Sequence, residues 1–121
     1  MMKGECLRFY VDENRRHRGV LLWEWLLEQA NAMGIRGSSA FRAIGGFGRH
    51  HDLHESRFFE LAGSTGVEID FIVGEGEADQ MIALVQREGL RVFYARFPAI
   101  FGVINAATDD PQDVGAVAGT A

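Results

Sequence analysis

The chain has 121 residues, of which 47% are hydrophobic and 24% are charged, so we expect one globular domain with a single core rather than a disordered segment. Its net charge of -5 argues against nucleic acid as a partner, because a phosphate backbone is normally met by a concentrated basic face. The single cysteine, Cys6, excludes an internal disulfide, and no apolar run is long enough for a signal peptide or a membrane span, so a cytoplasmic protein without direct membrane insertion is expected.

The first predicted element is a strand over residues 6–12, because apolar and polar residues alternate there. A polar turn is expected over residues 13–19. The segment VLLWEWLLEQANAMG, residues 20–34, has the spacing of an amphipathic helix, and Gly34 is expected to end it. The predicted apolar face of this helix consists of Trp23, Leu26, Leu27, Ala30 and Met33.

The second half of the chain repeats this order. Residues 39–44 form a predicted strand that runs into Gly45, and residues 57–62 fit either a short helix or a strand. The clearest strand pattern spans residues 67–73. A helix begins at Glu75, where carboxylates favour a helix N-terminus, and ends at Gly89. A strand over residues 91–97, a possible short extra C-terminal strand over residues 101–104 and a loose tail over residues 108–121 complete the chain.

The order strand, helix, strand, strand, helix, strand predicts an α+β, ferredoxin-like βαββαβ fold in a single domain over residues 1–107. Such a fold has a four-stranded antiparallel sheet with two helices on one face. Large side chains occur on both sides of the strands, for example Tyr10 beside Phe9 and Phe93 beside Tyr94. A monomer would expose one of these sets, so we expect self-association over the open face of the sheet.

The stretch GGFGRHHDLHE, residues 45–55, places a glycine-rich turn ahead of three histidines. It has neither the GxGxxG spacing nor the GK[ST] ending of a phosphate-binding loop. We therefore interpret the glycines as residues that give the backbone the freedom to leave the strand, with Phe47 fixing the turn. In a helix, His50 and His54 would lie on one face as metal ligands, but a solvent-exposed loop with pH-sensitive charge is the simpler explanation.

Patterns for catalysis are weak, so an enzyme is not expected. No GxSxG elbow occurs, and Cys6 is better explained by packing than as a nucleophile. Glu68 and Asp70 share one strand face and could act as an acid/base pair, although a solvent-facing or intersubunit position is the simpler account. The basic turn over residues 15–18 could meet an anion or could simply be a solvated loop.

Four segments carry a resemblance to a known family. They are RFYV at residues 8–11, AMGIRGSSAFRAIGGFG at residues 32–48, VEIDFIV at residues 67–73 and REGL at residues 87–90. Together they resemble the bacterial family catalogued as domain of unknown function 190, which is grouped with the nitrogen-regulatory PII and copper-tolerance CutA proteins. The resemblance covers residues 7–104. It implies a ferredoxin-like subunit and a PII-like homotrimer, which would bury the open face of the sheet.

The resemblance also implies a function, that of a non-enzymatic signalling protein. The loop after the second strand, Gly45 to Ser56, would contact a partner such as a membrane transporter or channel. A small effector, a nucleotide or another anion, would bind in a cleft between subunits near the base of that loop. The residues implied for effector binding are Arg42, Gly45, Gly46, Phe47 and Gly48. The alternative is a CutA-like protein that binds a divalent metal through His50, His51 and His54.

Overall fold

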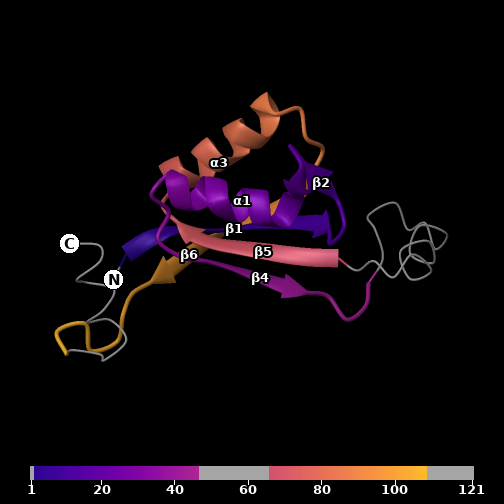
Figure 1. The fold of residues 1–121 in the computed structure, drawn as a ribbon. Helices are drawn as coiled ribbons and strands as arrows, with labels where there is room; N and C mark the ends of the chain where they lie inside the picture. Colours follow the sequence, from indigo (N-terminus) through magenta and orange to yellow (C-terminus); the bar gives the residue numbers. More distant parts are fainter. Residues whose placement is uncertain (1, 47–65, 109–121) are drawn as a thin grey trace.

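The computed structural model describes residues 2–46 and 66–108 of the chain (Figure 1). Every predicted helix and every predicted main strand in these ranges is present. In chain order the elements are β1 (Met2–Asp12), β2 (Arg16–His17), β3 (Val20–Leu21), α1 (Leu22–Ala32), β4 (Ser38–Arg42), β5 (Gly66–Val73), α3 (Glu75–Arg87) and β6 (Phe93–Phe101).

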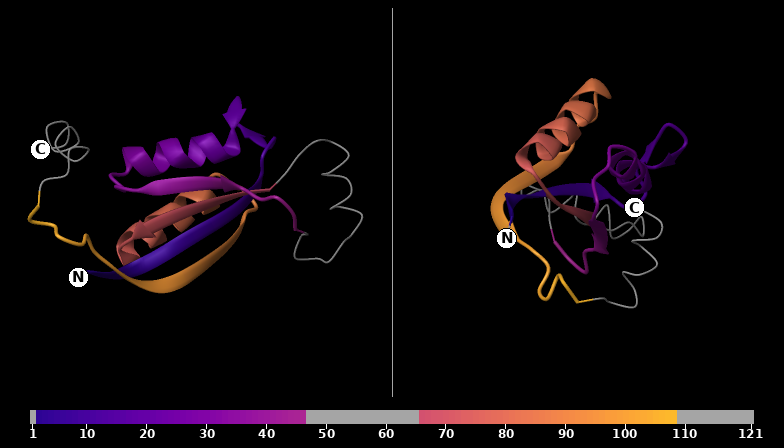
Figure 2. Two further views of the ribbon diagram at one scale, coloured as in Figure 1. Left: turned by 90° about the horizontal axis from the view of Figure 1, so that it is seen from below. Right: turned by 90° about the vertical axis from the view of Figure 1, so that its left-hand side faces the viewer.

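The main sheet has four strands in the order β4, β5, β1, β6, and each neighbouring pair is antiparallel. Strand β1 lies in the interior of the sheet, where Phe9 pairs with Ile69 on one side and with Tyr94 on the other. Both helices lie on the same face of the sheet (Figures 1 and 2). This order and layering are those of the ferredoxin-like fold, so the predicted fold class is confirmed.

The core lies between the two helices and the sheet. Strands β1 and β5 send alternate apolar residues into it, as their sequences predict, and the rings of Phe9 and Phe71 meet edge to face with centroids 5.8 Å apart. The buried residues of the four main elements are Leu7, Phe9, Val11, Leu22, Trp25, Leu26, Ala30, Val67, Ile69, Phe71, Val73, Ala78, Met81 and Val85.

The buried face of α1 differs from the predicted one. Leu22 and Trp25 are buried, whereas the predicted Trp23 and Met33 are only partly buried. The segment is apolar around most of its circumference, so spacing alone does not fix its rotation. The ring of His17 packs edge to face on Trp25, at 4.7 Å between centroids, and thereby closes over Trp25. Neither helix of the described ranges is long and apolar enough to cross a membrane.

Two further predictions need correction. The polar turn over residues 13–19 contains strand β2, which pairs with β3 in a separate two-stranded sheet. The short extra strand predicted over residues 101–104 is wrong. Strand β6 continues to Phe101, where it pairs with Met2, the first residue of β1, and residues 102–108 are not part of a strand. The predictions for residues 57–62 and for the tail from residue 109 onward lie outside the described residues.

Candidate functional site

Arg42 lies at the end of β4, where the chain leaves the sheet. Pairing continues one residue further, since the Ala43 N–H donates to the Gly66 carbonyl at 2.8 Å. The guanidinium of Arg42 pairs with the Glu13 carboxylate, with Nε 2.9 Å from Oε1 and Nη2 also in contact. The hydrogen bond to Glu13 raises the pKa of Arg42. The Arg42 side chain is nevertheless 67% exposed, so an anion in solution can reach it.

The two glycines that follow have different requirements. Gly46 has a φ of 152°, a backbone angle that residues with a side chain rarely adopt. Gly45 does not have such an angle, and a Cβ added to it would meet no atom within 4 Å. Gly46 therefore has a backbone angle that requires glycine, as expected where the chain leaves the strand, and the role of both glycines in a site stays a prediction. The remaining predicted site residues, Phe47, Gly48, His50, His51 and His54, lie outside the described residues and remain predictions.

A metal site is not formed elsewhere in the parts of the chain that the structure describes. Residues 2–46 and 66–108 contain no group of three or more His, Cys, Asp or Glu side chains that could hold a metal ion. The CutA-like alternative therefore still depends on the three histidines of residues 50–54, and it stays a prediction.

The face of the sheet that points away from the helices, here called the open sheet face, carries large apolar side chains. Phe41 is 53% exposed and Phe93 is 50% exposed, and the ring of Tyr10 lies 5.6 Å from that of Phe93. The strand registers assign to this face Met2, Cys6, Arg8, Tyr10, Ser39, Phe41, Glu68, Asp70, Ile72, Phe93 and Phe97. Exposed apolar side chains on one face make it a candidate contact surface.

A charge cluster lies in the middle of the open sheet face. Arg8 Nε is 2.8 Å from Asp70 Oδ1 and 3.2 Å from Glu68 Oε2, and the same guanidinium lies 5.1 Å from the centre of the Phe97 ring. Burial, together with the nearby Asp70 charge, raises the pKa of Glu68. Glu68 and Asp70, the possible acid/base pair of the sequence, therefore share one arginine in a cluster whose carboxylates outnumber its cation.

Cys6 lies beside this cluster on β1. Burial is the main cause that raises the pKa of its thiol, and Asp70 adds to the effect. The protonated thiol is a poor nucleophile, which favours the packing interpretation of this residue.

A second charge cluster lies on the helix side of the sheet. Arg96 of β6 contacts Glu5 of β1, with Nε 2.6 Å from Oε1, and Asp79 of α3, with Nη1 2.9 Å from Oδ1. The hydrogen bond from Arg96 lowers the pKa of Glu5. This cluster ties the first turns of α3 to the sheet.

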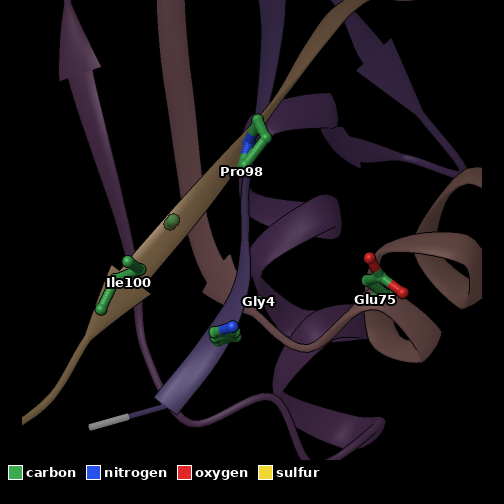
Figure 3. A pocket seen from close by; sticks show the side chains of 6 residues that line it. Gly4, Glu75, Pro98 and Ile100 are labelled. Carbon is green, nitrogen blue, oxygen red and sulfur yellow. The ribbon is translucent and has the colours of Figure 1, made fainter.

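An open cavity of about 730 Å³ lies beside that helix N-terminus, at the end of the sheet away from Arg42 (Figure 3). Glu75 of α3 faces Pro98 and Ile100 of β6 across it. Gly4 is required here, because a Cβ on it would lie 2.1 Å from the Val73 carbonyl oxygen. One indirect signal of this site is present in the sequence, namely the proline in an edge strand. The lining residues are Lys3, Gly4, Glu75, Pro98, Ala99 and Ile100.

The sequence analysis also missed the hairpin formed by β2 and β3. Strands of two residues are too short to show alternation, and the only signal was a glycine directly after the basic turn, at Gly19. The hairpin holds His17, the one histidine outside the glycine-rich stretch, against Glu88 at 2.8 Å.

Three comparisons relate the chain to known proteins. The family model of domain of unknown function 190, described as an uncharacterized ACR, matches residues 4–90. A UPF0166 protein of Aquifex aeolicus (strain VF5) is 26% identical over 102 residues, which is 78% of this chain and 97% of that protein. Among solved structures, a candidate PII-like signaling protein from Thermus thermophilus matches with 15% identity and a TM-score of 0.47, over 83% of this chain and 94% of that one.

Proposed function

Because the chain belongs to the family of domain of unknown function 190, we propose that it is a PII-like regulatory protein rather than an enzyme. It binds a small anionic effector at the base of the loop that follows β4, and it contacts a partner protein through residues 45–56. The observation that supports this best is the placement of Arg42. It ends an edge strand whose five residues are all exposed, and it lies three positions before Gly45, the first glycine of the loop.

The effector site uses the guanidinium of Arg42 as its anchor. A guanidinium has a planar fork of N–H donors that suits phosphate and carboxylate groups. Among the described residues, Glu13 contacts Nε and Nη2 of this fork, which leaves Nη1 to face an anion. Glu13 holds the arginine in place before the effector arrives, and the effector then shares it or displaces Glu13.

The effector cleft lies between subunits, so the assembly is part of the proposal. The subunits associate as a homotrimer through the open sheet face, which places exposed rings such as Phe41 and Phe93 in contact with a second copy. Phe41 belongs to β4, one residue before Arg42, so the contact lies on the same edge strand as the effector anchor, whose side chain is on the other face of the sheet.

A thermal-shift screen tests the effector site. Nucleotides and small dicarboxylates are added to wild-type protein, to Arg42→Ala and to Arg36→Ala, a control that removes an exposed arginine from the connection between α1 and β4. An effector raises the melting temperature of wild type and of the control, because it binds only the folded state, and Arg42→Ala loses most of that rise. An equal rise in all three proteins would reject Arg42 as the anchor.

Light scattering after size exclusion tests the assembly. A homotrimer has three times the 13.4 kDa chain mass. A monomer at all concentrations would reject the intersubunit cleft.

A further inference from the structure

The β2–β3 hairpin has a tightly specified turn. His17 pairs with Val20, and the two residues between them, Arg18 and Gly19, have φ angles of 53° and 81°. Two positive angles define a type I′ turn, which prefers Asn, Asp or Gly at both positions. An arginine at the first position is strained, and strain of this kind points to a role for the side chain.

The hairpin is fixed to the end of α3. The Arg15 side chain donates to the Arg91 carbonyl at 2.6 Å, and His17 Nε2 lies 2.8 Å from Glu88 Oε1. The Arg18 guanidinium donates two hydrogen bonds to the same carboxylate, from Nε to Oε1 at 2.6 Å and from Nη2 to Oε2 at 3.1 Å. Arg18 first, and His17 second, lower the pKa of Glu88 to about 2. Glu88 is therefore ionised at neutral pH and holds the hairpin in place.

This anchoring gathers positive charge at one place on an acidic protein. Residues 15–18 and 87–91, which the contacts above bring together, contain five arginines and one carboxylate, Glu88, while the chain as a whole has a net charge of -5. Two acidic residues, Asp12 and Glu13, precede the hairpin, and Glu13 is paired with Arg42. The other end of α3 has the opposite character, with Glu75, Glu77 and Asp79 in its first turns. The five arginines are Arg15, Arg16, Arg18, Arg87 and Arg91.

The shape of this surface selects the kind of ligand. The hairpin projects from the body of the protein at the N-terminal end of α1 (Figures 1 and 2). A projecting ridge does not enclose a small molecule, which needs a concave site, but an extended polypeptide can lie along it. Arg16 is exposed, and the Arg18 side chain is 66% exposed although its fork is held. A guanidinium that is already fixed by hydrogen bonds loses little further conformational freedom when it binds a carboxylate.

We propose that the β2–β3 hairpin and the end of α3 form a docking surface for an acidic segment of a partner protein. The proposal goes beyond the effector site, because it uses neither Arg42 nor the loop of residues 45–56. The local positive charge attracts Asp and Glu side chains, and the arrangement of the arginines fixes where the segment lies.

The test is fluorescence anisotropy with the full chain and a labelled peptide of alternating Glu and Ser, with a Lys and Ser peptide for comparison. The acidic peptide binds and the basic peptide does not, and the affinity for the acidic peptide falls as salt is added. Arg16→Glu weakens binding about tenfold or more, because it reverses an exposed charge on the ridge. Arg36→Glu is the matched control with the same change in net charge, and its affinity stays within about twofold of wild type.

Arg87→Glu on α3 provides a second variant that leaves the hairpin turn untouched, and it also weakens peptide binding. Equal weakening by Arg36→Glu would show a response to net charge alone and would overturn the proposal. Stronger binding to vesicles of phosphatidylcholine and phosphatidylserine than to the peptide would overturn it in favour of a lipid surface. A double variant, Arg42→Ala with Glu13→Ala, removes the effector anchor without leaving Glu13 unpaired beside the hairpin, and it retains peptide binding, so loss of effector binding and loss of the docking surface are separate results. If this double variant abolished peptide binding, the hairpin would not be the docking surface.

Discussion

The two faces of the sheet are built from the same strands and have similar apolar content, yet only one is covered. Alternate residues of β5 point to opposite faces, so Phe71 is fully buried beneath the helices whereas Ile72 is 46% exposed. The covered face is completed by α1 and α3 within the chain. The open sheet face is equally regular and has no such cover in the described residues, so its apolar side chains are exposed, and the proposed function assigns them to contact with a second copy.

Each face also carries one arginine that bridges two carboxylates. On the helix side Arg96 joins Glu5 and Asp79, which belong to different elements, and so stabilises the packing of α3. On the open sheet face Arg8 joins Glu68 and Asp70, which both belong to β5. The Arg96 cluster joins α3 to the sheet and so contributes to the fold. The Arg8 cluster only reinforces the pairing of β1 with β5, which is already part of the sheet. If the proposed association through the open sheet face is correct, the Arg8 cluster lies at the contact, and the following predictions test this difference.

The largest expected effect is a difference in the free energy of unfolding between substitutions on the two faces of the sheet. Phe71→Ala removes a fully buried ring that packs on Phe9, and we expect it to cost about 3–5 kcal/mol in the free energy of unfolding. Phe41→Ala removes a ring of the same size from the open sheet face and should cost less than about 1 kcal/mol in the monomer. Urea denaturation at low protein concentration measures both. Equal losses would mean that the open sheet face is part of the monomer core.

A second prediction separates the faces by association. Phe97→Asp places a charge on the open sheet face and should weaken self-association about tenfold or more, because the carboxylate would be buried at the contact. Ile100→Asp is the control, since it lies on the same strand, points to the other face and is 67% exposed. Analytical ultracentrifugation compares the two. The face assignment would be wrong if Ile100→Asp dissociated the protein as strongly.

The sequence was sufficient for the sheet, because alternation in β1 and β5 directly reports which residues are buried. It was not sufficient for the rotation of α1, because Trp23 and Trp25 both fit a helical stripe, and the contact of His17 with Trp25 depends on a hairpin too short to show a pattern. Arg42 was singled out through the family resemblance, and its role in a site stays a prediction, although the structure does place it at the end of β4. Its pairing with Glu13 was not predictable from the sequence, since the two residues are 29 positions apart in the chain.

A smaller effect is expected when the arginine of either charge cluster is replaced. Arg96→Met should lower the melting temperature of the folded unit, because it releases α3 from the sheet and leaves Glu5 and Asp79 without their shared cation. Arg8→Met should change the melting temperature less and weaken association more, because Glu68 and Asp70 then repel each other at the contact surface. Calorimetry at several protein concentrations distinguishes them. The opposite ranking would contradict the separate roles of the two clusters.

The pH dependence should give the smallest effect, with opposite signs on the two faces. Arg96 lowers the pKa of Glu5 from its ordinary value of 4.5, so Glu5 contributes stability that is present above that pH and is lost as the pH falls through the lowered pKa. Burial and Asp70 raise the pKa of Glu68 above 4.5, so the folded state holds that proton more tightly, and stability declines as the pH rises from 4.5 through the raised pKa.

Replacement of each carboxylate by its amide tests these signs. Glu5→Gln should flatten the loss of stability below pH 4.5, and Glu68→Gln should flatten the decline above it, as read from urea midpoints across the acid range. Association buries Glu68 further, so its contribution to the slope should grow with protein concentration, whereas that of Glu5 should not. A Glu68 slope that stays the same at all concentrations would show that its cluster lies outside the contact between subunits.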